Sequence, residues 1–340
     1  MAVIPDSKGE RPGRTKRRAA LATAVPVVMI AALGASTAWL LRDPVPGMMA
    51  RRGSIISVQS QAVDSDARYV NERIEVRGSA GLRVEMLMRR PAARDGAADA
   101  NAPPRAPTAA ARRPVFLILG GHASQERAAT LIEEPGDNIV VAMAYPFDGN
   151  PRVKGLAVLP LVPKIRQAIL DTPPAVMLAI DHLRSRPDVD TTRIELVGAS
   201  FGAPFAAMTA ALDPRVSRLW LVHGAGEPYT MLEHNLEKSV PWRVPRMLVA
   251  GLANVLASGP RLAPERWVGQ VAPRPVVMIN ATEDERLPRH AIVTLHDAAR
   301  QPKEIIWMPG LHVQSNRKDV LQGLVRTVLA KSTTLAAGGS

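Results

Sequence analysis

The chain has 340 residues, 46% of them hydrophobic, so it can bury one large core and predicts one principal domain with extensions. It contains no cysteine, which excludes disulfides, thiolate metal sites and a cysteine nucleophile. The net charge of +12 is concentrated in residues 1–18 and 89–113, each with six Lys or Arg against two acids. Neither segment carries interleaved aromatic residues for base stacking, so a nucleic-acid partner is not expected.

The N-terminal segment is a candidate for crossing a membrane. Residues 19–41 carry no charge over 23 positions, which is long enough to span a bilayer. Basic residues at 16–18 precede it, and the positive-inside rule then puts the tail in the cytoplasm and the rest outside. Small residues at 36–38 are also compatible with a signal-peptidase site. We therefore expect a cell-envelope protein in which residues 1–44 are a basic tail plus a transmembrane anchor, or a removable signal peptide that leaves a secreted or periplasmic product.

For the next part of the chain, the sequence predicts little regular structure before a hairpin. Residues 45–68 are interpreted as a linker that runs into short strand-like pieces. Alternating apolar residues at 69–76 and 82–88 flank the glycine-containing turn 78–81, and this pattern is typical of an antiparallel hairpin. Residues 91–113 are mostly Ala, Pro, Arg and Asp without apolar periodicity, so they are expected to form a mobile surface loop.

From Pro114 onward, short apolar runs alternate with longer helical segments, the pattern of parallel strands joined by crossover helices. The strand candidates are residues 115–119, 138–144, 193–197, 218–222, 275–279 and 304–308. The helix candidates are residues 124–133, 162–184, 203–212, 290–300 and 317–329. Pro173 and Pro174 are expected to split the second helix. The fold class predicted is α/β: a mostly parallel twisted sheet flanked by helices, within a domain at 69–332 and followed by a tail at 333–340.

One segment, residues 226–270, interrupts this alternation. It is predicted to be a mostly helical cap inserted after a sheet strand. Its apolar residues favour a hydrophobic substrate or simple packing. They are Met231, Leu232, Trp242, Met247, Leu248, Leu252 and Trp267. The chain has no zinc-ligand spacing, and neither a metal nor another cofactor is expected.

A serine in a glycine-flanked turn is the strongest functional signal. Ser200 lies in the sequence Gly-Ala-Ser-Phe-Gly, between an apolar strand candidate and a helix of small residues. A strand that runs into a helix through such a turn can hold a serine hydroxyl exposed above a sheet. Such a turn needs glycine at positions 198 and 202, because side chains there would block the close approach of helix and strand.

A serine hydroxyl needs a general base, and histidine suits that task near neutral pH. His312 is the best-placed candidate, since it lies in a Gly-containing loop after the last strand, at the edge where a parallel sheet gathers its functional loops. Asp284, in the loop after the preceding strand, is the predicted orienting acid. Glu283 and Glu227 remain alternative orienting acids.

Charge that develops on a carbonyl oxygen during attack requires fixed donors, and backbone amides in turns can supply them. The amide of Phe201, directly after the serine, is one candidate donor. The turn Gly120-Gly121-His122, after the first parallel strand, offers the second through Gly121. His122 is expected to shape this turn rather than to act as a base.

With these residues in place, the chain from about Tyr69 to Leu329 resembles an α/β hydrolase of the serine esterase and prolyl-oligopeptidase-like type. The order Ser200, Asp284, His312 matches that family's order of nucleophile, acid and base. The family often has His-Gly at the oxyanion turn where this chain has Leu119-Gly120.

The resemblance implies a serine hydrolase, carboxylesterase-like, that acts on a small-molecule ester or related acyl substrate through an acyl-enzyme. Acyl transfer, thioester hydrolysis or peptide hydrolysis could use the same three residues. An envelope binding protein that keeps the fold without catalysis is the alternative from another class.

Overall fold

A computed structural model describes the chain in five stretches, namely residues 43–92, 112–121, 124–150, 153 and 155–337. The expected membrane segment, most of the loop expected at 91–113, and His122 lie outside the described residues. Within the described stretches, no helix combines the length and the apolar character that a bilayer crossing requires.

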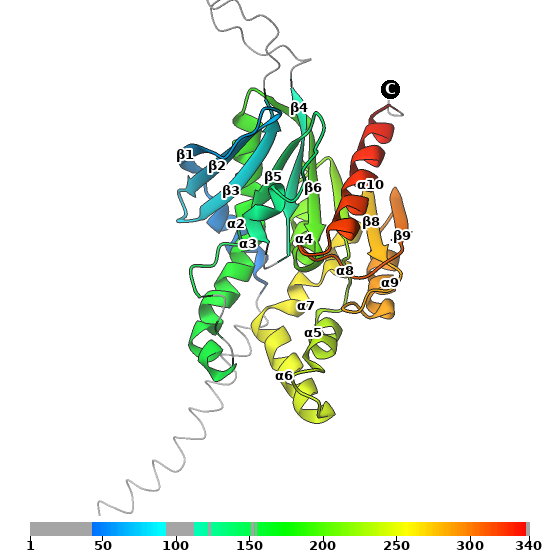
Figure 1. Cartoon of the computed structure of the whole chain (residues 1–340). Coiled ribbons are helices and arrows are strands. Elements are labelled where there is room, and N and C mark those ends of the chain that lie inside the picture. Colours follow the sequence, from blue (N-terminus) through cyan, green and yellow to red (C-terminus); the bar gives the residue numbers. More distant parts are fainter. Residues whose placement is uncertain (1–42, 93–111, 122–123, 151–152, 154, 338–340) are drawn as a thin grey trace, which may run out of the picture. The chain divides into compact units, whose positions relative to one another are not determined.

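The described strands form a single nine-stranded sheet in the order β1-β2-β3-β5-β4-β6-β7-β8-β9 (Figure 1). Their bounds are β1 Ile55–Val63, β2 Tyr69–Gly78, β3 Arg83–Pro91, β4 Arg113–Leu119, β5 Ile139–Met143, β6 Val189–Ala199, β7 Arg218–Val222, β8 Val276–Ala281 and β9 Lys303–Met308. The pairs β1–β2, β2–β3 and β3–β5 are antiparallel, and all pairs from β5 to β9 are parallel. The predicted mostly parallel sheet is therefore confirmed, and the predicted hairpin corresponds to β2 and β3.

Helices cover both faces of the sheet. The α-helices are α2 Val45–Arg52, α3 Val162–Ser185, α4 Ala203–Leu212, α5 Pro228–Leu236, α6 Arg243–Leu256, α7 Gly259–Leu262, α8 Pro264–Trp267, α9 Arg289–Ala298 and α10 Lys318–Ala337. Short 3₁₀ helices are η2 Gln125–Ala129, η3 Gly155–Leu161, η4 Ser200–Gly202 and η5 Val268–Gln270. Because both faces are covered, every residue of β5 and of β8 is buried, which explains the unbroken apolar runs in the sequence.

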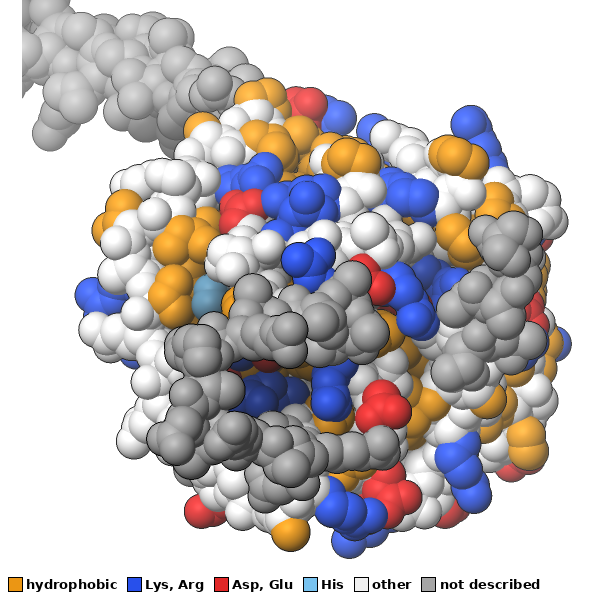
Figure 2. All heavy atoms as spheres, turned by 90° about the horizontal axis from the view of Figure 1, so that it is seen from above, with side chains coloured by type: hydrophobic (Ala, Val, Ile, Leu, Met, Phe, Trp, Pro, Cys, Tyr) orange, Lys and Arg blue, Asp and Glu red, His pale blue; other side chains and the backbone are white. Residues whose placement is uncertain are grey.

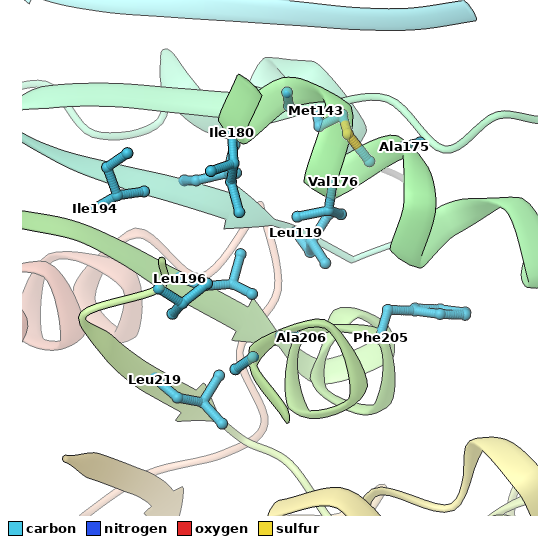
Figure 3. Packing of buried hydrophobic residues seen from close by; sticks show 14 of the residues in the cluster. Leu119, Met143, Ala175, Val176, Ile180, Ile194, Leu196, Phe205, Ala206 and Leu219 are labelled. Carbon is cyan, nitrogen blue, oxygen red and sulfur yellow. The ribbon is translucent and has the colours of Figure 1, made fainter. Parts of the chain in front are cut away.

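The larger core cluster lies on the face covered by α3 and α4. In Figure 3, Leu119, Leu196 and Leu219 from neighbouring strands lie together with Val176 of α3 and Ala206 of α4. The strand side chains that point to the other face of the sheet form a second cluster. Phe116, Val197 and Trp220 belong to it, together with Leu324 of α10.

Helix α3 runs unbroken through Pro173 and Pro174, so the predicted split is wrong. Prolines remove two backbone donors and normally kink or end a helix. Both are buried here, in a helix whose side chains fill the larger core cluster. Packing of the apolar face against the sheet therefore offsets the lost backbone bonds.

The expectation of a linker at 45–68 is also wrong, because this stretch forms α2 and the edge strand β1. Met48 of α2 is buried in the larger core, and the guanidinium groups of Arg51 and Arg52 pair with Asp171 and Asp181 of α3. Strand β1 pairs along its length with β2 while most of its side chains stay exposed. Its few apolar residues do not mark a buried face, since Ile56 and Val58 are both exposed, so the pattern of a half-buried strand is weak there.

Smaller differences concern element ends. The helix predicted at 124–133 is reduced to the 3₁₀ helix η2, and the tail predicted to begin at 333 continues α10 to Ala337. The expected loop at 91–113 is shorter at both ends, because Pro91 belongs to β3 and Arg113 to β4.

The segment predicted as a helical cap, 226–270, contains α5 to α8 and η5. Helix α8 and η5 pack beside α4, whereas α5 and α6 pack mainly on each other. The apolar side chains of α6 and its N-cap are largely outside the core: Trp242, Leu248 and Leu252 are 73%, 70% and 61% exposed. The packing interpretation therefore fails for these three residues.

Charged side chains are mixed on the face seen from above in Figure 2. Lys and Arg side chains there are separated by acidic, apolar and other residues. Several of the described arginines are used in pairs within the fold, such as Arg215 with Asp213 and Arg186 with Asp188.

Candidate active site

Four polar side chains lie at the carboxyl ends of neighbouring parallel strands. Ser200 follows β6, His223 follows β7, Asp284 follows β8 and His312 follows β9. Since parallel strands end at one edge of a sheet, loops distant in sequence converge there, at the lower end of the sheet in Figure 1.

Ser200 is held in a strained turn between β6 and α4. Its φ is +52°, in the left-handed region that a residue with a side chain rarely adopts. A Cβ added at Gly198 would lie 2.5 Å from the Cβ of Ala206, and one added at Gly202 would overlap the carbonyl oxygen of Leu119. The two glycines thus allow α4 and β4 to approach the turn, as the sequence pattern predicts.

The structure brings the three predicted side chains together. Nε2 of His312 lies 2.7 Å from Oγ of Ser200, and Nδ1 of His312 lies 2.8 Å from Oδ2 of Asp284. The His312 ring is 2% exposed, so these contacts are shielded from water. With Nδ1–H donating to the carboxylate, Nε2 is left as an acceptor for the serine hydroxyl.

Asp284 is fixed by its own loop. Oδ1 of its carboxylate accepts hydrogen bonds of 2.9 Å from the amides of Arg286 and Leu287. Burial by itself would raise the pKa of Asp284, but the hydrogen bond and charge of the His312 imidazole and the backbone amide of Arg286 hold that pKa well below its ordinary value. The carboxylate is therefore charged across the neutral pH range, as a partner for an imidazolium must be.

The two alternative acids lie elsewhere. Glu283 is exposed. The carboxylate of Glu227 accepts hydrogen bonds from the hydroxyls of Thr230 and Thr294, which lower its pKa, and it lies near His290. Of the three candidate orienting acids, Asp284 is the one whose carboxylate contacts the His312 ring.

Glu285 was not singled out from the sequence, yet it holds the His312 loop. Its Oε2 accepts a 2.9 Å hydrogen bond from the amide of His312. Its Oε1 accepts a 2.8 Å bond from Arg317, whose guanidinium also donates to the carbonyl of His312 at 2.6 Å. The only available signal was its place next to Asp284 in an acidic loop, which is more often a solvated surface.

His223, a buried histidine next to the Ser200 site, carries no sequence pattern that singles it out. Its Nδ1 accepts a 2.9 Å hydrogen bond from the amide of Val313, so this atom cannot also donate to Asp284, whose Oδ2 lies 3.5 Å away. In this tautomer the proton is on Nε2, which is buried without a partner among the described residues.

These side chains also form a possible metal cluster. In the described part of the chain, His223, Asp284 and His312 bring ligand atoms within 4.8 Å of one another. The two ring nitrogens that face the carboxylate already have hydrogen-bond partners, namely the Val313 amide and Asp284 itself. A metal ion would have to replace both bonds.

The two predicted oxyanion residues border the same cavity as Ser200. Gly121 follows the end of β4, and its carbonyl accepts hydrogen bonds from Ser124 and Gln125. The hydroxyl of Tyr145, after β5, donates to the carbonyl of Gly120 and so fixes the turn. Burial raises the pKa of Tyr145, which keeps it protonated as a donor.

The cavity beside Ser200 has a volume of about 590 Å³ and is lined mainly by apolar side chains of the strands and of α10. None of its described lining residues comes from the segment 226–270, so the predicted cap does not form its wall. A second cavity of about 310 Å³ lies on the other side of Phe201, between Tyr145, Phe205 and Ile165 of α3.

Comparison with known proteins gives distant similarities. No family model matches the chain. The uncharacterized protein YfhR of Salmonella typhi and that of Salmonella typhimurium (strain LT2) are each 25% identical over 138 residues, or 40% of this chain. The match spans 46% of the length of these relatives, which is less than half.

Solved structures resemble the chain over most of its length. Acetyl xylan esterase 1 from Thermoanaerobacterium sp. JW/SL YS485 aligns with a TM-score of 0.57 and 14% identity, covering 85% of this chain and 94% of the esterase. An acetyl xylan esterase from Paenibacillus sp. R4 gives 0.54 and 15%, covering 83% and 92%. With the sheet order and parallel pairing described above, these similarities show that the chain has the α/β-hydrolase fold.

Proposed function

We propose that the chain is a serine hydrolase that cleaves a carboxylic ester or related acyl bond through an acyl-enzyme. The observation that carries this proposal is the continuous hydrogen-bonded series Ser200, His312 and Asp284, with Ser200 in a strained turn at the edge of a cavity. In the proposed roles Ser200 is the nucleophile, His312 the general base and acid, and Asp284 the residue that orients the imidazole.

In the first half of the reaction, Oγ of Ser200 attacks the acyl carbon while Nε2 of His312 accepts the hydroxyl proton. The bond from the acyl carbon to the leaving oxygen then breaks, and the imidazolium returns the proton to the leaving alcohol. In the second half, water attacks the acyl-enzyme and gives a proton to His312. Collapse of that intermediate breaks the bond to Oγ, which regains the proton, and releases the acid.

The backbone amides of Phe201 and Gly121 are the proposed oxyanion donors. Their support is local: Phe201 directly follows the nucleophile, and Gly121 lies in a turn held by Tyr145 and Ser124 at the same cavity. Fixed amides are effective because they need no reorganisation when charge develops on the oxygen.

The bond type is the finer part of the proposal. The acetyl xylan esterases that share the fold act, by their names, on acetyl esters, and this favours an ester over a peptide or thioester. Acyl transfer would need only that an alcohol replace water in the second half of the reaction. A catalytically inactive envelope protein is the remaining alternative, and the contacts around His312 make it the weaker one.

We also propose a cell-envelope location, supported by the uncharged segment 19–41 and the basic residues before it. Intact-mass measurement of protein recovered from the envelope distinguishes the two forms. A mass equal to that of the whole chain indicates an anchor. A mass equal to that of a chain that begins after about residue 38 indicates signal cleavage.

The test of the function is labelling with a fluorophosphonate, which reacts with activated serines. We expect peptide mapping to find the label on Ser200 in the native protein, and no label there after unfolding. Ser200→Ala and His312→Ala should each lower kcat for a small aryl ester by about a thousandfold or more while leaving the unfolding transition in place.

Ser315→Ala is the matched control, because Ser315 is an exposed serine at the same cavity. This variant should be labelled on Ser200 and should hydrolyse the aryl ester as the unaltered protein does. Label spread over several serines, or full activity in Ser200→Ala, would contradict the proposed function.

A further inference from the structure

The cavity beside Ser200 is bounded by apolar side chains on three sides. Phe116 and Val140 contribute from the sheet, Leu131 from the segment after η2, and Val325 and Leu329 from α10. Polar residues that border the cavity, such as Arg286 and Asn316, come from the loops at the carboxyl edge that also carry Asp284 and His312. The cavity is therefore polar near Ser200 and apolar along the strands.

Helix α10 lies along the sheet (Figure 1) but is fastened to it by polar contacts near its ends. Before the helix begins, Arg317 donates to the carbonyl of His312. Near the other end, the hydroxyl of Ser332 donates at 2.7 Å to the buried carboxylate of Glu195. Between Lys318 and Ala330, Leu324 is the one buried residue.

The apolar side chains of α10 that border the cavity are consequently only half-buried. Leu321, Val325, Val328 and Leu329 all border it and all remain partly accessible. Apolar surface facing an empty space lacks the contacts that it would have in a packed core. An apolar ligand that entered from the Ser200 end would supply those contacts.

We propose that this cavity binds the acyl chain of the substrate, and that the substrates are esters of medium-length aliphatic acids. The inference rests on the proposed function, because it takes the acyl carbon to lie at Ser200. The chain would extend from Ser200 between the sheet and α10, while the leaving alcohol stays on the solvent side.

The helix sets the length of that chain. From Leu321 to Leu329, α10 advances about 12 Å at 1.5 Å per residue, which accommodates an extended chain of roughly eight to ten carbons. The second cavity is the competing position. It is smaller, about 310 Å³ against about 590 Å³, and neither Ser200 nor His312 borders it.

The test uses esters of one aryl alcohol with acids of two to fourteen carbons. We expect kcat/KM to rise about threefold to fourfold for each added methylene up to eight to ten carbons, and then to level off or fall. Val325→Trp, which fills the cavity, should lower the ratio of kcat/KM for the ten-carbon ester to kcat/KM for the acetate at least tenfold.

Ile165→Trp is the matched control, because it fills the second cavity with the same side chain. It should keep the profile of the unaltered protein. Leu329→Ala, which removes a side chain from the far wall, should move the optimum to longer acids and covers the case in which Val325→Trp does not fold. A flat dependence on chain length, or loss of long-chain activity in Ile165→Trp alone, would overturn the inference.

Failure of the inference can be told from failure of the function. If Ser200 reacts with a short fluorophosphonate and the acetate is hydrolysed, but longer esters gain nothing, the function stands and the acyl cavity does not. If Ser200 does not react and no ester is hydrolysed at any length, the proposed function itself fails.

Discussion

Two adjacent carboxylates hold His312 in different ways. Asp284 contacts the ring through Nδ1, and Glu285 contacts the backbone amide of the same residue. The first interaction sets the tautomer and the charge, whereas the second sets where the loop places the ring. Arg317 completes the second arrangement by bridging Glu285 and the carbonyl of His312.

Glu285 is therefore expected to be a positioning residue. Glu285→Ala should lower kcat about tenfold with little change in KM, because a shifted imidazole affects proton transfer more than binding. Glu285→Gln, whose amide oxygen can still accept from the His312 amide, should recover most of the loss. Steady-state kinetics at several pH values checks this, with exposed Glu283→Gln as control. Equal losses in the Ala and Gln variants would argue against positioning.

The turn that carries Ser200 depends on the absence of a side chain at Gly202. Gly202→Ala places a methyl group into the carbonyl of Leu119, so the free energy of unfolding should fall by about 3 kcal/mol or more. Gly47→Ala in α2 is the control, because a Cβ there meets nothing within 4 Å and Ala favours a helix. Denaturant unfolding of both variants measures the difference, and similar stabilities would contradict the packing argument.

At the scale of elements, α10 is fixed to the sheet by a buried polar group. The Glu195 carboxylate, 3% exposed, accepts from the Trp220 indole at 2.6 Å, from Ser332 at 2.7 Å and from Arg218 at 3.3 Å. A buried carboxylate needs such partners, since an unpaired one is costly. Through Ser332 this cluster attaches the C-terminal part of α10 to β6, next to the ion pair of Lys331 with Glu304 of β9.

Loss of one partner should loosen that attachment. Ser332→Ala removes a buried hydrogen bond to a charged group, so the free energy of unfolding should fall by about 1–3 kcal/mol. In Ser315→Ala, which removes an exposed hydroxyl, the free energy of unfolding should fall by less than about 0.5 kcal/mol. Hydrogen exchange of the α10 amides provides the second measurement, and exchange as slow as in the unaltered protein would show that Ser332 does not hold the helix.

At the scale of the whole molecule, one buried histidine links stability to pH. His296 is 4% exposed, and its Nε2 lies 2.9 Å from Oδ1 of Asn280. Burial, and then the nearby charges of Lys303 and Arg289, lower the pKa of His296 to about 4, with Asp297 opposing them. The folded ring is therefore neutral at a pH where the unfolded ring, which titrates near 6.5, is charged.

The sign of the effect follows from proton binding. Between pH 6.5 and about 4 the unfolded chain binds the proton and the folded chain does not, so acid favours unfolding. The contribution is present above pH 6.5 and is lost as the pH falls toward 4. His296→Gln should remove it, reducing the fall in unfolding free energy over this window by on the order of 2 kcal/mol. Denaturant unfolding of the unaltered protein and of His296→Gln at pH 4.5 and 7.5 measures this difference. An equal fall in the unfolding free energy of both proteins would show that His296 does not contribute.

The sequence by itself determined the regular part of the fold and the three side chains at its edge. Parallel strands buried on both faces leave unbroken apolar runs, which is why β4, β5, β7 and β8 could be predicted to within two residues of their ends, whereas the polar first part of β6, residues 189–192, was missed. The order of Ser200, Asp284 and His312 could be predicted because each follows such a strand, and parallel strands end at one edge.

Only the tertiary structure decided which contacts hold that edge and what lies beside it. Helix α2 depends on Asp171 and Asp181, which lie far along the chain, and α3 keeps its prolines because its apolar face is packed. Glu285, His223 and Tyr145 carry no local pattern that identifies their partners. The cavity under α10 is likewise invisible in the sequence, because its walls come from β4, β5, β6 and α10, which lie far apart along the chain.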